Sequence, residues 1–341
     1  MKSEKDNVDM EQKSDVEFRA EKLYKSKREN FNFLIREVVS NAIHATIIRL
    51  KNEAIIHFQP KVEISFLVEE NNVKIVVKDN GEGFTPLNRK FFTHLDAQNF
   101  QKEQLCFYPM GQGRLSIIYF SDESLYQSVY KDKNGEYKKN SFNYPDNAPS
   151  LFDIENLKCD KTEKVDSGTE LTLTIRKQKT YKRANTFFKK YNDIEKIENW
   201  FIENFFPFFM EIETLEFLID FNGQKINISK SYIEKNVKCI PFSVNFDGNE
   251  DNEPENKDES ENVKEFKIWL VKKENSQKTK NQITCFARHL KVEIEDGKIE
   301  YEIELPVAYD WFLTSEYFDN NVDQKGDKIE IPSDHIEKIK L

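Results

Sequence analysis

The chain has 341 residues, of which 38% are hydrophobic and 33% charged, and its formal net charge is −10 at pH 7. This length allows two domains with cores of their own, and the composition is typical of a protein with a well-solvated surface. The negative balance argues against broad electrostatic adhesion to nucleic acid, although it leaves room for a local basic groove.

Membrane insertion and metal or disulfide frameworks are also disfavoured. No run of apolar residues approaches the ~18 that a membrane helix needs, and the first thirty residues lack an apolar signal core, so we expect a cytoplasmic protein. The four cysteines lie far apart, without metal-ligand or redox spacing, and are expected as isolated thiols; they are Cys106, Cys159, Cys239 and Cys285.

The N-terminal part is expected to begin with a flexible arm, residues 1–28, which is charge-dense and favours helix only near 16–24. From Arg28 to Leu50 apolar residues recur at helical spacing, which predicts a long buried helix. The runs Val62–Val68 and Val73–Val77 predict two strands.

The middle of the chain alternates between helix and strand patterns. Residues 85–110 show no clear periodicity and are expected as a mobile loop, followed by a short apolar helix to about Tyr119. Strands are expected over residues 125–144, with a hairpin turn at Asn134-Gly135, and from Gly168 to Ile175. Residues 193–209 predict a helix whose aromatic residues form core.

A second unit is expected from residue 232 to residue 341. An acidic stretch, Asp247–Glu265, is expected as a disordered insertion in it. The strands expected in this unit are Val237–Phe246, Phe266–Val271, Gln282–Phe286, His289–Ile294 and Ile299–Ile303.

Glu37 and Asn41 lie one turn apart on the long helix, so their side chains share one face. An amide oxygen can complete a magnesium shell together with phosphate oxygens and water, and a nearby carboxylate can orient and deprotonate an attacking water. This spacing is common on helices and taken alone favours a solvated surface pair. The buried character of the helix tips the balance, because polar groups on a buried helix need partners.

Asp79-Asn80-Gly81-Glu82-Gly83 follows the second predicted strand. A polar turn is the ordinary interpretation of such a composition. The carboxylate could also accept a hydrogen bond from an amino group on a base, while the glycines let the backbone approach a ring. Gly111-Gln112-Gly113 before a helix is typical of a phosphate cradle, although the pattern alone is weak.

In this order the segments resemble the GHKL superfamily of Bergerat-fold ATPases, which includes DNA gyrase B subunits, MutL and MORC proteins, large heat-shock chaperones and sensor histidine kinases. The resemblance covers residues 29–231. It implies an α+β fold, with a two-layer α/β sandwich followed by a smaller α/β transducer-like domain of a ribosomal-protein type. It also implies that ATP and Mg²⁺ are the ligands.

Carried over by position, Glu37 corresponds to the general base, Asn41 to the magnesium ligand and Asp79 to the carboxylate that contacts adenine. Residues 85–110 correspond to the ATP lid. The remaining residues implied in nucleotide binding are Ala45, Gly81, Gly83, Gly111, Gln112, Gly113, Arg114 and Thr169. His44 departs from the pattern, because many members have Asp there; we assign it no catalytic role.

The second unit resembles the transducer domain of the gyrase, MutL, MORC and chaperone branches, in which a loop lysine reaches the γ-phosphate. Lys325 is the candidate for that role and Lys328 the second choice; a solvated loop lysine is an equal alternative. The histidine-kinase branch is disfavoured because no histidine precedes the long helix.

The resemblance therefore predicts an ATPase that hydrolyses ATP slowly and works as a nucleotide-gated clamp, with ATP-dependent homodimerisation. An ATP-sensing scaffold with little turnover is the alternative. A separate effector subunit or a further C-terminal region, a role in bacterial defence, and DNA or protein handling are left open.

Overall fold

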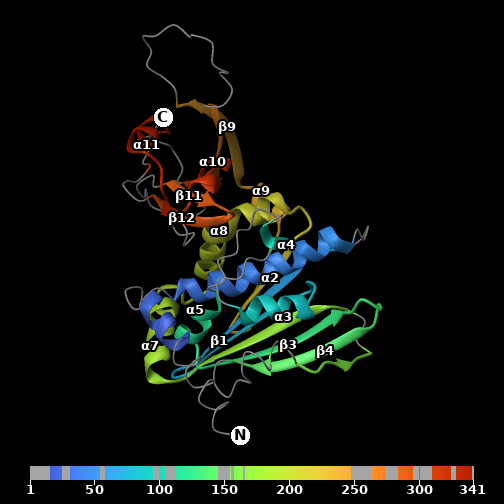
Figure 1. Cartoon of the computed structure of the whole chain (residues 1–341). Coiled ribbons are helices and arrows are strands. Elements are labelled where there is room, and N and C mark those ends of the chain that lie inside the picture. The colour runs from blue at the N-terminus through green and yellow to red at the C-terminus, as the bar shows by residue number, and fades with distance from the viewer. Residues whose placement is uncertain are drawn as a thin grey trace, which may run out of the picture. The chain divides into compact units, whose positions relative to one another are not determined.

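The computed structural model describes residues 16–24, 31–53, 58–94, 100–103, 113–144, 154, 157–163, 166–246, 263–272, 283–294, 299, 309–323 and 328–339 (Figure 1). It divides into two compact units. The first consists of Met1–Trp200 and Thr214–Ile228, and the second of Phe201–Glu213 and Ser229–Leu341. Each unit holds one β-sheet with helices, so the predicted α+β fold class is confirmed.

The sheet of the first unit has eight strands in the order β5-β4-β3-β6-β2-β1-β7-β8. Neighbouring strands run antiparallel, except that β1 and β7 are parallel. The strands are β1 (Lys61–Val68), β2 (Val73–Asp79), β3 (Glu123–Lys131), β4 (Tyr137–Asn143), β5 (Asp160–Lys161), β6 (Gly168–Ile175), β7 (Glu216–Phe221) and β8 (Gln224–Ile228).

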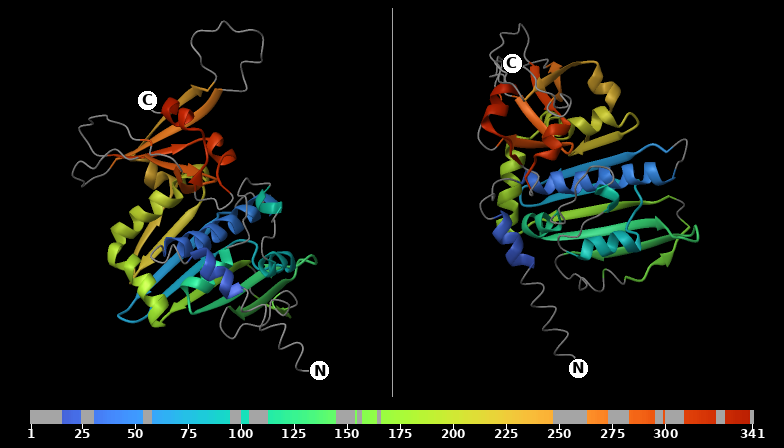
Figure 2. Two further views of the ribbon diagram at one scale, coloured as in Figure 1. Left: turned by 60° about the vertical axis from the view of Figure 1, so that its left-hand side comes forward. Right: turned by 45° about the horizontal axis from the view of Figure 1, so that its top comes forward.

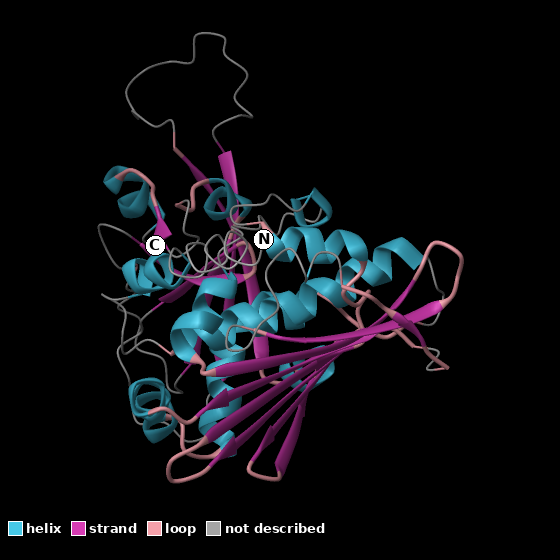
Figure 3. Ribbon diagram, turned by 60° about the horizontal axis from the view of Figure 1, so that its bottom comes forward, coloured by secondary structure: helices cyan, strands magenta, loops and turns pink. Residues whose placement is uncertain are grey.

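The long helix α2 (Asn32–Glu53) lies across one face of this sheet and contacts β1 and β2 (Figure 2, Figure 3). Its apolar residues at spacings of three and four are buried, among them Leu34, Val38 and Ile43. They meet the inward side chains of the strands, where each buried aliphatic side chain contributes about 1.5–3 kcal/mol. The helix is thereby fixed on the sheet, and its position determines where its polar side chains point.

The other helices of the first unit are α3 (Pro86–Thr93), α4 (Phe100–Glu103), α5 (Gly113–Phe120), α7 (Gln178–Lys190) and the first part of α8 (Ile194–Glu211); residues 16–24 are also helical. The prediction of a mobile loop over residues 85–110 was wrong at α3 and at α4, which are helical. Thr85 caps α3, since its Oγ1 accepts from the Asn88 amide at 3.1 Å, and Pro86 occupies the first turn.

The second unit has a six-stranded sheet in the order β14-β12-β11-β13-β10-β9. Its core includes Phe266, Trp311, Leu313 and Phe318. The elements are α9 (Lys230–Glu234), β9 (Val237–Asn245), β10 (Val263–Lys272), β11 (Ile283–Ala287), β12 (Leu290–Ile294), β13 (Tyr309–Thr314), α10 (Glu316–Asn320), β14 (Lys328–Ile329) and α11 (Ser333–Ile339).

The second unit differs from its prediction at the acidic insertion and at one strand. Residues 247–262 of the predicted acidic insertion lie outside the described residues. Its last three residues, 263–265, belong to β10. Of the predicted strand Ile299–Ile303 only the first residue is described, whereas β13 was not predicted. None of the described helices is long and apolar enough to cross a membrane.

Candidate functional site

Four side chains of α2 form a row, because Glu37, Asn41, Ala45 and Arg49 follow one another at intervals of four residues. At 1.5 Å per residue, the backbone positions of Glu37 and Ala45 lie about 12 Å apart along the helix. We call these four residues the α2 row. The row is long enough for different groups of one extended ligand to contact its two ends.

Glycines pack against the α2 row at two places. A Cβ atom added to Gly81 would lie 2.6 Å from the Ala45 carbonyl carbon and Cβ, so the loop after β2 contacts the row there. A Cβ added to Gly113 would lie 2.5 Å from Oε2 of Glu37 and 3.5 Å from Nδ2 of Asn41, so the start of α5 contacts the other end. The structure thus brings together residues that the sequence separates by up to 76 positions.

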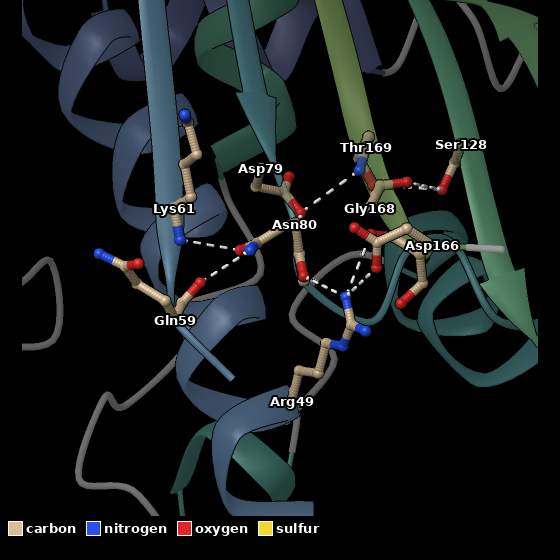
Figure 4. Close-up of polar contacts among 11 residues, drawn as sticks. Arg49, Gln59, Lys61, Asp79, Asn80, Ser128, Asp166, Gly168 and Thr169 are labelled. Carbon is tan, nitrogen blue, oxygen red and sulfur yellow. Dashed lines mark hydrogen bonds and ion pairs between the residues drawn. The ribbon is translucent and has the colours of Figure 1, made fainter. Parts of the chain in front are cut away.

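Asp79 ends strand β2 and pairs in register with Thr169 of β6. Its Oδ1 accepts a hydrogen bond from the backbone amide of Gly81 at 2.8 Å. It also accepts one from the backbone amide of Thr169 at 3.3 Å (Figure 4). No described residue donates to its Oδ2. Burial raises the pKa of Asp79 to about 7, although both backbone hydrogen bonds and the charge of Arg49 act in the opposite direction. The carboxylate is therefore held in place through Oδ1, and Oδ2 is available to accept a hydrogen bond from a ligand.

The backbone beside Asp79 passes where only glycine fits. Gly83 has φ 75° and Gly168 has φ 153°. A Cβ at the first would collide with the Val129 carbonyl oxygen, and at the second with the Asp79 carbonyl oxygen. Both chain segments therefore follow courses that a residue with a side chain rarely adopts.

Arg49 joins the segments on either side of Asp79. Its Nη1 donates to the carbonyl oxygen of Asn80 at 2.7 Å, to Oδ1 of Asp166 at 2.8 Å and to the carbonyl oxygen of Ser167 at 3.3 Å (Figure 4). The side chain of Asn80 continues this network to the backbone of Lys61 and Gln59, each at 2.8 Å. Sequence reasoning missed Arg49, although its place four residues after Ala45 was a usable signal.

Ser128 of β3 is a second residue that the sequence did not reveal. Its Oγ donates to the Gly168 carbonyl oxygen at 3.0 Å (Figure 4) and accepts from the Phe84 amide at 2.8 Å. It thereby connects the loop after β2 with the start of β6. The position of both glycine-containing segments relative to Asp79 depends on this hydroxyl.

At the other end of the α2 row, Lys102 of α4 donates from Nζ to Oδ1 of Asn41 at 2.5 Å. Burial raises the pKa of Glu37, against the charges of Lys102 and Arg36. Burial also lowers the pKa of Lys102 to about 8, against the charge of Glu37. The ammonium group of Lys102 thus contacts the amide oxygen of Asn41, and the Glu37 carboxylate lies nearby. A metal cation could occupy the same position.

The donor set at this end fits a metal that arrives with its own ligands. No group of three or more His, Cys, Asp or Glu that could hold a metal ion occurs in the part of the chain that is described. Mg²⁺ uses one or two protein oxygens and completes its shell with phosphate oxygens and water. Asn41, with Glu37 beside it, matches that requirement, whereas a metal that needs a full protein cage does not.

The remaining predicted site residues stand apart from this arrangement or lie outside the description. Arg114 is buried, and its Nη1 donates to the Phe92 carbonyl oxygen of α3. Gly111, Gln112 and Lys325 lie outside the described residues. Lys328 is described, and its backbone amide donates to Oδ1 of Asp323 at 3.1 Å.

Known proteins are similar to this chain in structure. No protein-family model and no curated protein matches the sequence. Among solved structures, the ATPase region of Saccharomyces cerevisiae topoisomerase II is similar, with a TM-score of 0.47 and 13% sequence identity, over 91% of this chain and 82% of that one. A likeness of this size does not indicate the function of this chain.

Proposed function

We propose that the chain binds ATP together with Mg²⁺ along the α2 row and hydrolyses the ATP slowly. The observation that carries this proposal is the α2 row together with Asp79, a fixed carboxylate acceptor near its Ala45–Arg49 end, and the carboxylate–amide pair at its other end. We call these the base end, with Asp79, and the phosphate end, with Glu37 and Asn41.

At the base end, Oδ2 of Asp79 would accept a hydrogen bond from the exocyclic amino group of adenine. Gly81 and Gly83 would let the ring lie close to the backbone, and Thr169 would hold the carboxylate through Oδ1. Guanine has a carbonyl oxygen where adenine has the amino group, so its oxygen would face the carboxylate. This arrangement supports preference for adenine over guanine, because two acceptors that face each other are left unsatisfied.

At the phosphate end, Asn41 would contribute its amide oxygen to Mg²⁺, which when bound would neutralise charge on the phosphate oxygens. Lys102 would leave that oxygen and become available to the phosphates. Glu37 would orient a water molecule and take its proton at a carboxylate oxygen, and its raised pKa makes it a better base than an exposed glutamate. Gly113 would bring the first amides of α5 to the phosphates, with Gly111 and Gln112 completing that contact.

The experiment that tests this function is calorimetric titration of the full chain with ATP, GTP and inorganic tripolyphosphate, each with Mg²⁺. We expect ATP to bind more tightly than GTP and tripolyphosphate, and phosphate release from ATP to require Mg²⁺. The absence of ATP binding at millimolar concentration would refute the proposal. Equal affinities for ATP and tripolyphosphate would contradict the role of Asp79.

The motif resemblance extends this proposal to a nucleotide-gated clamp, in which ATP favours pairing of two copies and Lys325 contacts the γ-phosphate. The test is the mass of the full chain in solution with and without a non-hydrolysable ATP analogue. We expect a doubling of mass with the analogue, and an unchanged mass would remove the clamp. Phosphate release too slow to measure, combined with ATP binding, would instead favour an ATP-sensing scaffold.

A further inference from the structure

The ammonium group of Lys102 contacts the same oxygen that the phosphate end offers to a metal ion. Lys102 belongs to α4, which contacts α2, and its Nζ donates to Oδ1 of Asn41 at 2.5 Å. The side chain is half-buried. Protein oxygens bind Mg²⁺ at about 2.0–2.1 Å, so a metal ion on Oδ1 would be an immediate neighbour of the ammonium group.

The charges at the phosphate end compensate for one cation rather than two. Asn41 is neutral, and the carboxylate of Glu37 provides the negative charge. The positive charges of Lys102 and Arg36 both act on Glu37, against the burial that raises its pKa. An amide oxygen has two lone pairs, so its geometry alone would allow Lys102 and Mg²⁺ to share it. The repulsion between them opposes this, because like charges in direct proximity repel and one carboxylate cannot offset both.

Arg49, the cationic member of the α2 row, is held more firmly than Lys102. Its Nη1 donates to the carbonyl oxygens of Asn80 and Ser167 and to Asp166, so its removal would take a donor from all three. Lys102 instead donates to a side-chain amide, from a helix of four residues. Its flexible stem can turn the ammonium group away by rotation about side-chain bonds. Lys102 is therefore the replaceable cation of the two.

We propose that Lys102 competes with Mg²⁺ for Oδ1 of Asn41, so that the metal binds tightly only together with nucleotide phosphates. This inference rests on the function proposed above. The phosphates bring the negative charge that a second cation at this end requires, and their oxygens complete the metal shell. They also give the displaced ammonium group an anionic partner. Lys102 is thereby a positioning residue that makes metal and nucleotide bind as a unit.

The test is Mn²⁺ binding to the full chain without nucleotide, measured by electron paramagnetic resonance of the free ion. Lys102→Met keeps the length of the side chain and removes its charge, and we expect it to bind Mn²⁺ at least about tenfold more tightly than the wild type. Lys51→Met, an exposed change in the last turn of α2, is the matched control and should behave as the wild type does.

Binding elsewhere on the acidic surface is subtracted with Asn41→Ala, added to each chain in turn. Mn²⁺ binding that survives this change is not binding to Oδ1 of Asn41. Equal Asn41-dependent affinities in the wild type and Lys102→Met would overturn the proposal. Lys102→Arg keeps the charge and should bind Mn²⁺ as weakly as the wild type does. Should Lys102→Met fail to fold, Lys102→Gln replaces it with the same expected result.

Binding of ATP in the presence of EDTA separates competition from a structural role of Lys102. Without a divalent metal, the ammonium group remains as the cation that faces the phosphates, so Lys102→Met should bind metal-free ATP about three- to tenfold more weakly than the wild type. Loss of a structural contact would weaken Mn²⁺ and ATP binding together, whereas competition changes them in opposite directions. Changes in the same direction would overturn the proposal.

The outcome also differs from failure of the proposed function. Absence of ATP binding to the wild type in the presence of Mg²⁺ would refute that function and this inference with it. Normal binding of ATP with Mg²⁺, combined with equal Mn²⁺ affinities in the wild type and Lys102→Met, would overturn the competition alone.

Discussion

The two ends of the α2 row are built in different ways. At the base end, Asp79 belongs to a seven-residue strand, and the donors that hold it are backbone amides of Gly81 and Thr169. At the phosphate end, the partner of Asn41 is the side chain of Lys102, on a helix of four residues. Sheet geometry fixes one end, whereas compensating charges occupy the other.

This difference determines where substitutions should act. The Thr169 amide belongs to strand β6 and the Gly81 amide lies two residues after Asp79, so neither donor can move away from the carboxylate. The base end is therefore preorganised, and substitutions there should change affinity and stability. Side chains on a short helix can move, so the phosphate end can exchange Lys102 for a metal-bound ligand. Substitutions there should change turnover more than affinity. The following changes test this division.

Glu37→Gln should have the largest effect. It keeps the size of the side chain and removes the proton acceptor, so phosphate release should fall about 10²- to 10⁴-fold while ATP affinity stays nearly constant. Steady-state phosphate release and calorimetry measure the two quantities. Glu195→Gln, an exposed position on α8, is the control. Normal turnover in Glu37→Gln would end the assignment of the base.

Asp79→Asn should weaken ATP binding about 10- to 100-fold. The amides of Gly81 and Thr169 require an acceptor, so the new amide oxygen should turn toward them and its NH₂ group should face the adenine amino group. Calorimetry with MgATP measures the loss, and tripolyphosphate binding should not change. Asp334→Asn, on the exposed start of α11, is the control. Undiminished ATP affinity would mean that the base end does not determine ATP affinity.

Arg49→Met should lower the free energy of unfolding by about 1–3 kcal/mol, since the carbonyl oxygens of the half-buried Asn80 and the buried Ser167 lose a donor. ATP affinity should also fall, because the carbonyl groups of Asn80 and Ser167 are next to the segments that position Asp79. Urea denaturation measures the stability. Arg176→Met removes an exposed ion pair with Glu123 and should cost less than about 1 kcal/mol. Equal costs in the two variants would argue against a preorganised base end.

The pH dependence should be the smallest effect. Burial raises the pKa of Asp79 from its ordinary 3.8 to about 7, so the folded chain binds this proton more tightly than the unfolded chain does. Its contribution to stability is therefore fully present below the ordinary value and is lost as the pH rises through about 7. ATP binding needs the carboxylate and should strengthen about five- to tenfold from pH 6 to pH 8.

Parallel titrations of wild type and Asp79→Asn, by calorimetry and by urea denaturation, measure both trends. The variant should lack the opposed trends of stability and affinity. Affinity that is independent of pH in the wild type would contradict a partly protonated Asp79.

Much of the first unit could be predicted from its sequence. Apolar periodicity predicted α2 and the strands β1, β2 and β6. The β3–β4 hairpin followed from its Asn134-Gly135 turn signal. The helix α3 was missed although Thr85-Pro86 is a helix-start signal, since its short sequence has few apolar repeats. The strand β13 was not predicted, although Pro306, three residues before it, is a boundary signal.

The sequence also predicted only part of the candidate site. The positions of Glu37 and Asn41 relative to each other follow from helix geometry, and the structure adds their closeness to Gly113. No spacing rule predicts that Thr169 pairs with Asp79 across ninety residues, or that Lys102 lies on Asn41. These contacts arise from tertiary packing, to which a single sequence gives no direct guide.

The pairing of β2 with β6, and of β1 with β7, also affects the rate and order of folding. β1 begins at Lys61 and its parallel neighbour β7 at Glu216, so loop closure over some 150 residues precedes completion of the sheet. Such long-range pairing makes folding slow. During synthesis, a chain that has not yet reached Thr169 lacks one of the two backbone amides that hold Oδ1 of Asp79. The base end can therefore form only after most of the first unit has left the ribosome.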